Sequence, residues 1–179
     1  MKKIIASRLD QNLVENLLQL LKICILEALK EEKKQIYTKA DGTIVTDTDK
    51  NIHSIISNRL LDLYPEIPVI SEEGDFNEES FLQKIYWLID PIDGTTSFVK
   101  GENTYTINIA LIKNGFPCLG VVANPPSKTI WYGLDNKAFV IKNNIKHKLK
   151  VKSLNKKNIR IITSKNLDEK TKEFIKKFI

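Results

Sequence analysis

Acidic residues beside turn residues are the feature of this sequence that could do chemistry. Residues 87–96 (WLIDPIDGTT) begin as an apolar stretch that ends at Asp90. Pro91 then turns the chain, and Asp93 follows. Two carboxylates three residues apart around a proline can converge on one point, and the carbonyl of Ile92 can face the same point. Hard oxygen ligands of this kind suit Mg²⁺ or Mn²⁺ rather than zinc.

Two further acidic segments accompany this one. Residues 45–49 (VTDTD) hold Asp47 and Asp49, and residues 70–75 (ISEEGD) hold Glu72. Any one of these carboxylates taken alone is typical of an ordinary turn or helix cap. Together they indicate a cation site, because carboxylates gathered at buried strand ends repel one another unless a cation joins them.

The residues that follow this carboxylate run suit a phosphate group. Gly94 permits close approach of another group to the backbone. Thr95 begins a helix or turn, and the free amides at such a start can hold an anion. The sequence therefore predicts a phosphate position beside the cation site.

Other chemistries find little support in the sequence. His53 and His147 are the only histidines, and both are interpreted as structural or surface residues. Cys24 and Cys118 lie too far apart for a metal or redox spacing, which favours a reducing cytoplasm. The chain contains no glycine-rich P-loop and no GxSxG nucleophile motif.

Composition is typical of a folded globular chain. It has 179 residues, 42% hydrophobic and 28% charged, which excludes global disorder and a disulfide scaffold. No apolar run approaches the roughly 20 residues that span a bilayer. No apolar leader precedes Asp10, so we expect no signal peptide. The length predicts one domain with a sizeable core.

The net charge of +6 is unevenly distributed. Residues 1–136 hold 14 Lys/Arg and 19 Asp/Glu, whereas residues 137–179 hold 14 and 3. An acidic body can hold cations, and a basic tail can attract phosphates. We interpret the tail as a solvated surface, because only three of the 28 basic residues are arginines and specific phosphate recognition favours arginine. We therefore expect no nucleic-acid partner.

The periodicity of the apolar residues predicts two helices followed by a run of strands. Residues 9–34, and a second segment from residue 48 or 49 to Tyr64, repeat apolar side chains at helical spacing. From residue 86 to residue 151 short apolar strands alternate with turns such as Asn114-Gly115. This order predicts an α+β or layered α/β fold, with a largely antiparallel sheet flanked by helices.

These motifs resemble the inositol monophosphatase superfamily of lithium-sensitive, magnesium-dependent phosphomonoesterases. Residues 90–96 (DPIDGTT) look like its signature, and residues 71–73 (SEE) look like its upstream glutamate motif. Residues 39–42 (KADG), 68–73 (PVISEE) and 105–112 (YTINIALI) look most like the CysQ type, which removes the 3′-phosphate of adenosine 3′,5′-bisphosphate. The resemblance covers almost the whole chain.

The resemblance implies a sugar-phosphatase fold, two or three Mg²⁺ ions, and a role for each matching residue. Asp49 and Thr95 would orient the attacking water. Gly94 and Thr96, together with Thr95, would hold the phosphate, and the role of Asp47 stays open. The Mg²⁺ ligands would be Glu72, Asp90, the carbonyl of Ile92, and Asp93.

Relative to that superfamily, we expect the chain to be C-terminally truncated. Its members are longer and carry a further metal-binding aspartate in a Trp-Asp motif, which does not follow Trp131 here. Residues 1–155 would form the metal-binding N-terminal α+β domain. Residues 156–179, with a predicted strand at 159–163 and helix at 167–178, would start an incomplete C-terminal α/β domain.

One departure from the CysQ pattern sets the alternatives for function. Residues 96–97 (TS) stand where CysQ-type proteins carry Lys-Glu, and inositol monophosphatases carry Thr at the position of Thr96. An inositol or sugar monophosphate phosphatase is therefore the alternative, and an inactive truncated remnant is the third. The expected partner is a small phosphorylated substrate, with no transmembrane segment. We expect a cytoplasmic location; peripheral association at the inner membrane and the oligomeric state stay open.

Overall fold

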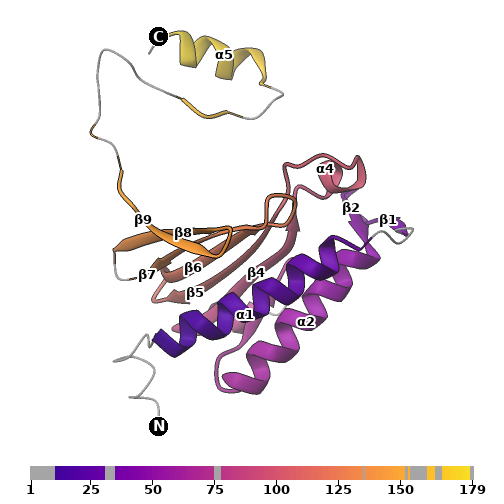
Figure 1. Cartoon of the computed structure of the whole chain (residues 1–179). Coiled ribbons are helices and arrows are strands. Elements are labelled where there is room, and N and C mark those ends of the chain that lie inside the picture. Colours follow the sequence, from indigo (N-terminus) through magenta and orange to yellow (C-terminus); the bar gives the residue numbers. More distant parts are fainter. Residues whose placement is uncertain are drawn as a thin grey trace. The chain divides into compact units, whose positions relative to one another are not determined.

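The computed structural model describes residues 11–30, 35–74, 78–134, 136–151, 153, 161–163 and 167–177. The chain divides into two units, Met1–Leu149 and Lys150–Ile179 (Figure 1). The first unit contains a sheet with two long helices on one face, and it holds all of the acidic segments singled out above. The described residues of the second unit contain one short helix.

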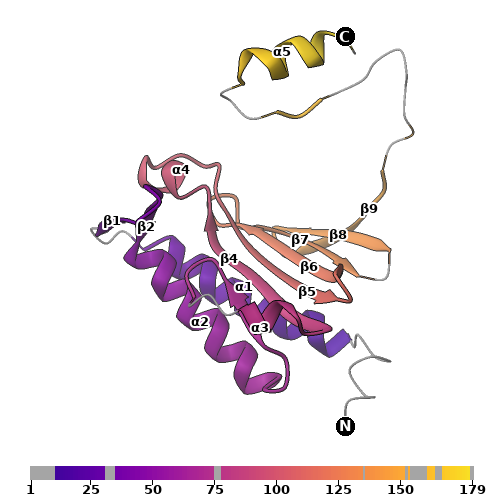
Figure 2. The same ribbon diagram turned by 180° about the vertical axis from the view of Figure 1, so that it is seen from behind.

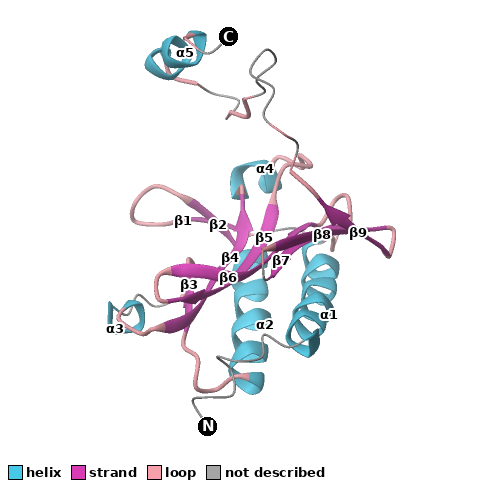
Figure 3. Cartoon of the chain, turned by 90° about the vertical axis from the view of Figure 1, so that its left-hand side faces the viewer, coloured by secondary structure: helices cyan, strands magenta, loops and turns pink. Residues whose placement is uncertain are grey.

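Helix α1 (Gln11–Ala28) packs beside helix α2 on one face of the sheet (Figures 1 and 3). It buries a stripe of side chains at helical spacing, which includes Leu17, Leu21 and Cys24. Of the predicted span 9–34, residues 9, 10 and 31–34 lie outside the described residues. None of the helices that the structure describes is long and apolar enough to cross a membrane.

Helix α2 (Asp47–Leu63) begins slightly earlier than predicted because Thr46 caps it. The Thr46 side chain accepts the backbone N–H of Asp49, and the Asp49 carboxylate accepts the backbone N–H of Thr46. This reciprocal capping box satisfies two amides that a helix start leaves open. The helix ends where predicted, at Tyr64, whose N–H donates to the Leu60 carbonyl at 2.8 Å.

A short antiparallel hairpin precedes α2. It consists of β1 (Ile36–Thr38) and β2 (Ile44–Thr46), as the sequence allowed. The turn between them contains Gly42 at a φ of +86°, a conformation that glycine adopts without strain. The hairpin leads directly into the N-cap of α2, so the two elements share Thr46.

The described part of the first unit contains one seven-stranded sheet in the order β3-β4-β5-β6-β7-β8-β9 (Figure 2). Only β3 and β4 pair in parallel, and every other neighbouring pair is antiparallel, which confirms the largely antiparallel sheet. Helix α3 (Glu78–Phe81) lies in the connection between β3 and β4. The strands are β3 (Val69–Ser71), β4 (Ile85–Asp93), β5 (Thr106–Lys113), β6 (Phe116–Asn124), β7 (Thr129–Leu134), β8 (Lys137–Lys142) and β9 (Ile145–Leu149).

The two faces of the sheet differ in burial. Side chains alternate between the faces along each strand. Ile107 and Ile109 of β5 are at most 1% exposed and belong to the core beneath α1 and α2. On the opposite face, Leu88 and Trp131 are 40% and 37% exposed. The core of this unit therefore lies between the sheet and the two helices (Figure 3).

The second unit contains helix α5 (Glu169–Lys176), within the predicted helical span. Asp168 is its N-cap, and its Oδ1 accepts the backbone N–H of Thr171 at 2.9 Å. The strand predicted over 159–163 is wrong for residues 161–163, and residues 159 and 160 lie outside the described residues. A strand needs a neighbour to pair its backbone groups, and no described segment of this unit pairs with these residues.

Candidate metal centre

The acidic segments of β3 and β4 meet because these two strands are parallel. Ser71 pairs with Ile89, and the N–H of Glu72 donates to the Ile89 carbonyl at 3.3 Å. Glu72 therefore leaves β3 directly beside Asp90 of β4. Parallel pairing thus brings together two carboxylates that lie 18 positions apart in the chain.

A bulge near the end of β4 changes the direction of the residues that follow Asp90. Asp90 pairs with Asn108 and Asp93 pairs with Thr106, so β4 has one residue more than β5 between the two pairs. Pro91 lies in this bulge, where its missing N–H is tolerated. In a regular strand, residues three apart point to opposite faces. The bulge breaks this alternation, so that Asp93 lies close enough for its charge to raise the pKa of Asp90.

Asp90 is in an unfavourable position for a charged side chain. Its Oδ1 is buried and has no hydrogen-bond partner among the described residues. The pKa of Asp90 is raised to about 7, first by burial, then by the charges of Glu72 and Asp93, by a hydrogen bond with Glu72 and by the charge of Asp49. A bound cation would reverse this effect, because it favours the ionised carboxylate.

Lys39, in the loop after β1, neutralises the neighbouring glutamates. Its Nζ donates to Glu73 Oε1 at 2.6 Å and to Glu72 Oε1 at 3.4 Å. Burial alone would lower the pKa of Lys39, but the hydrogen bonds and charges of Glu73 and Glu72 outweigh it and raise that pKa. The ammonium group therefore occupies one side of Glu72, and the carboxylate of Asp90 occupies another.

These side chains do not form a finished ligand set in this conformation. No three His, Cys, Asp or Glu side chains within the described ranges lie close enough together to hold an ion. The donors still fit a hard cation, since the buried Oδ1 of Asp90 is an oxygen ligand without a hydrogen-bond partner among the described residues and has Glu72 beside it. Mg²⁺ prefers carboxylate and carbonyl oxygens of this kind. The fit thus rests on the ligand chemistry and on the buried, unsatisfied oxygen.

Asp49 and Thr95 lie in contact, 46 positions apart in the chain. Thr95 Oγ1 lies 3.2 Å from Asp49 Oδ1 and 3.0 Å from the Ile92 carbonyl oxygen, and its single proton can be donated to either. Asp49 is 1% exposed, and its Oδ2 accepts the Thr46 N–H at 2.9 Å and a hydrogen bond from the Thr46 hydroxyl. The capping box of α2 therefore fixes the carboxylate that holds Thr95. Both ends of this contact were predicted site residues.

Asp47 has a local role in the structure. Its Oδ1 accepts the backbone N–H of Thr48 at 3.0 Å in the first turn of α2. A carboxylate at this position also interacts favourably with the helix dipole. These contacts account for its position without assigning it a metal.

The short helix α4 (Thr95–Val99) begins at Gly94, which has a φ of +89°. A Cβ at this position would lie 3.0 Å from the Thr104 carbonyl oxygen, so the backbone conformation and the close packing both require glycine. Gly94 and Thr96 are exposed and Thr95 is half-buried. The structure therefore brings the three predicted phosphate residues to the surface beside Asp93.

A groove with a volume of about 820 Å³ extends from this cluster over the open face of the sheet. Glu72 and Asp90 line one part of it, and Asn108, Ala110 and Val122 are among the residues that line the rest. The carboxylates are therefore accessible from the face of the sheet that α1 and α2 do not cover.

Sequence reasoning missed two residues that support the cluster. Lys39 appeared there only as part of a family motif, and its pairing with Glu73 spans 34 positions. His53 was interpreted as structural or surface, but its Nδ1 is joined by a 2.8 Å hydrogen bond to the Ser71 hydroxyl. One signal was available, because His53 follows Asp49 by four residues and so lies on the same face of α2.

Comparison with known proteins shows the family of the chain. Residues 5–178 match the model of the inositol monophosphatase family. The chain belongs to the inositol monophosphatase family. This confirms the family and the layered α/β fold predicted from the sequence. Among curated members, the CysQ 3′(2′),5′-bisphosphate nucleotidase of Salmonella typhimurium is 34% identical over 139 residues, which cover 76% of this chain and 56% of that protein.

Solved structures of other family members share the fold. The Thermotoga maritima IMPase TM1415 superposes with a TM-score of 0.68 at 25% identity, over 80% of this chain and 55% of that one. A structure described as an IMPase/NADP phosphatase complexed with Mg²⁺ and phosphate superposes with a TM-score of 0.57 at 26% identity, over 78% and 49%. The present chain thus spans about half the length of the family members that it matches.

Proposed function

We propose that this chain carries the metal-binding part of a Mg²⁺-dependent phosphomonoesterase that removes the 3′-phosphate of adenosine 3′,5′-bisphosphate. The observation that carries the proposal is Asp90, whose buried Oδ1 has no partner among the described residues and whose neighbours are further carboxylates. The similarity to CysQ nucleotidases supports the substrate, and the family supports the reaction class.

Four groups of the chain would hold Mg²⁺. They would include Glu72, Asp90 and Asp93, whose mutual repulsion a cation relieves, together with the carbonyl of Ile92, which faces Thr95. When bound, the metal would lower the pKa of a bound water and neutralise the phosphate. Glu72 would exchange its contact with Lys39 for the cation, because one carboxylate oxygen cannot serve both well.

Asp49 and Thr95 would orient the attacking water and take up its proton. Thr95 Oγ1 can accept a hydrogen bond from water while donating its own proton to Asp49 Oδ1. Asp49 Oδ2 is already occupied by Thr46, which leaves Oδ1 directed at Thr95. The carboxylate would therefore act as a general base through the hydroxyl. Its fixed position supports this role, because Asp49 is also held by the capping box of α2 through Thr46.

Gly94, Thr95 and Thr96 would hold the phosphate. The positive φ of Gly94 turns the chain so that the amides at the start of α4 follow directly after Asp93. The exposure of Gly94 and Thr96 leaves this turn open to a substrate. The phosphate would therefore lie beside the carboxylates that bind the metal.

An inositol or sugar monophosphate is the second candidate substrate. Thr96-Ser97 favours it, since the CysQ type carries Lys-Glu there. The cytoplasmic location stays a prediction.

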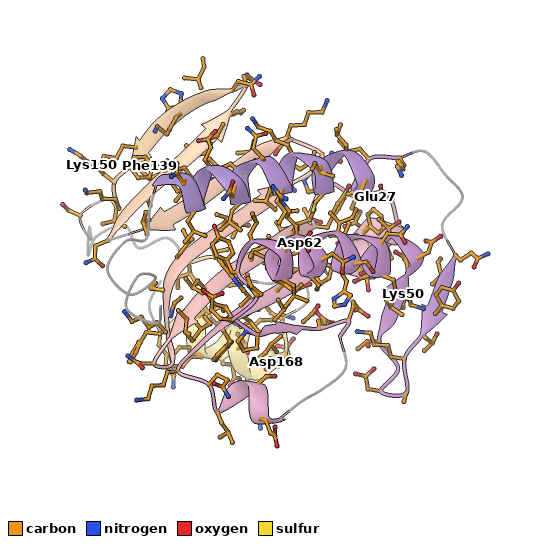
Figure 4. All side chains as sticks on the ribbon, turned by 90° about the horizontal axis from the view of Figure 1, so that it is seen from below. Glu27, Lys50, Asp62, Phe139, Lys150 and Asp168 are labelled. Atoms are coloured by element: carbon orange, nitrogen blue, oxygen red, sulfur yellow. The ribbon has the colours of Figure 1, made fainter. Side chains whose placement is uncertain are left out.

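Phosphate release by the purified chain tests the proposal. Adenosine 3′,5′-bisphosphate and inositol 1-phosphate are compared with and without Mg²⁺, in the wild type and in Asp90→Asn. Asp62→Asn is the matched control, because Asp62 is exposed near the far end of α2 (Figure 4). We expect Mg²⁺-dependent release from the nucleotide in the wild type and Asp62→Asn only. Release from the inositol phosphate alone would favour the second candidate. No release from a folded sample would indicate an inactive remnant.

A further inference from the structure

Helix α2 contacts both carboxylate segments through one of its faces. Asp49 binds Thr95, and one helical turn later His53 binds Ser71, the residue before Glu72. Residues four apart on a helix lie above one another, so the two contacts lie on the same face of α2. We propose that His53 is a positioning residue for the metal ligand Glu72 and acts through the Ser71 hydroxyl. The inference rests on the proposed function and names a further residue of that same site.

The Ser71 hydroxyl lies at the centre of the turn that presents Glu72. It is 2.8 Å from His53 Nδ1, and it also accepts the backbone N–H of Glu73 at 3.3 Å. The N–H of Gly74 donates to the Ser71 carbonyl at 3.2 Å and closes the turn. The hydroxyl therefore links the imidazole to the backbone on the far side of Glu72, so that the ring fixes the turn rather than only filling space.

The imidazole also packs directly against this turn. A Cβ added at Gly74 would lie 3.3 Å from His53 Cε1, which is closer than ordinary van der Waals contact. His53 itself is half-buried, in the middle of α2. The hydrogen bond at Nδ1 thus joins the ring to the turn, and at Gly74 the ring leaves little room for a side chain.

Among the described residues the turn has two other attachments, which would keep it folded without the histidine. The N–H of Glu72 donates to the Ile89 carbonyl, and Glu73 pairs with Lys39. Neither attachment fixes the side chain of Glu72, which is exposed and also lies within 3.4 Å of Lys39. Loss of His53 should therefore change how often Glu72 faces Asp90, more than it changes whether the turn forms.

Magnesium binding by the intact chain tests this inference. We expect His53→Ala and Ser71→Ala each to weaken the Mg²⁺ affinity measured by calorimetry about ten-fold or more, the usual size of effect for residues that orient metal ligands. His53→Asn should recover most of the loss, because its amide can replace Nδ1 as a hydrogen-bonding partner. The double variant His53→Ala/Ser71→Ala should bind no more weakly than either single variant.

His147→Ala is the matched control, since His147 is an exposed histidine on β9. Thermal unfolding without metal separates a positioning role from a structural one. A His53→Ala protein that is less stable yet binds Mg²⁺ as tightly as the wild type would overturn the inference, as would a His53→Asn protein no better than His53→Ala. A wild type that binds no Mg²⁺ would overturn the proposed function and this inference with it. The inference would be supported if His53→Asn and His147→Ala bind Mg²⁺ like the wild type and the other variants bind it more weakly.

Discussion

The substitution Asp90→Asn should stabilise the metal-free protein at pH 8. The folded-state pKa of Asp90 is about 7, against an ordinary value of 3.8, chiefly because of burial and then because of neighbouring charges. A carboxylate whose pKa rises on folding binds its proton more tightly in the folded state. Its contribution to stability is complete below pH 3.8 and is lost as the pH rises towards 7. Above that, the ionised Asp90 opposes folding, and Asp90→Asn removes the charge.

The size of the effect follows from the two pKa values. A rise from 3.8 to about 7 corresponds to at most about 4 kcal/mol in the free energy of unfolding. Asp90 is only half-buried, so solvent screening reduces the expected difference to about 1–2 kcal/mol. Asp90→Asn should therefore unfold at a higher urea concentration than the wild type at pH 8, and this advantage should shrink at pH 5.

The assay is urea unfolding in a chelator, followed by the fluorescence of the tryptophans. Trp87 is fully buried beside the site, so its emission reports loss of the core. Asp62→Asn, an exposed carboxylate on the same unit, serves as the charge-matched control. Equal pH dependence in the wild type and Asp90→Asn would refute the electrostatic reasoning, as would a less stable Asp90→Asn protein at pH 8.

Three further predictions follow from single contacts. Gly94→Ala should destabilise the protein by about 1–2 kcal/mol, because it combines a positive φ with a close carbonyl. Thermal unfolding should show a larger loss of stability for Gly94→Ala than for Gly42→Ala. Gly42 has a similar φ, but no atom lies within 4 Å of a Cβ added there. Thr95→Val should lower kcat by about 10²-fold with Mg²⁺ affinity retained, and Thr95→Ser should restore it. Burial raises the pKa of the Cys24 thiol to about 12, so mass spectrometry should find it unmodified by iodoacetamide unless the chain is unfolded.

The features that depend on residues adjacent in the chain could be predicted from the sequence. The apolar stretch before Asp90, with Pro91 behind it, already indicates a strand that delivers a carboxylate. The start of α2 was predicted within two residues, because the apolar side chains of this segment repeat at helical spacing. Such signals are local, so chain order alone reveals them.

The contacts between distant segments could not be predicted from residue types alone. The contact of Asp49 with Thr95 depends on how α2 packs against β4, and it was expected only because of the family resemblance. The pairing of Lys39 with Glu73 depends on where the hairpin lies. The β-branched residues 161–163 also failed to form a strand, since residue type does not supply the partner that a strand requires.

Calorimetric titration of the chelated, intact chain with Mg²⁺ at pH 8 tests the central claim most directly. The claim is that the carboxylates around Asp90 form a magnesium site within this chain. We expect saturable Mg²⁺ binding by the wild type and by Asp62→Asn, and none by Asp90→Asn under the same conditions. Equal binding by the wild type and Asp90→Asn, or no binding by a folded wild type, would contradict the claim.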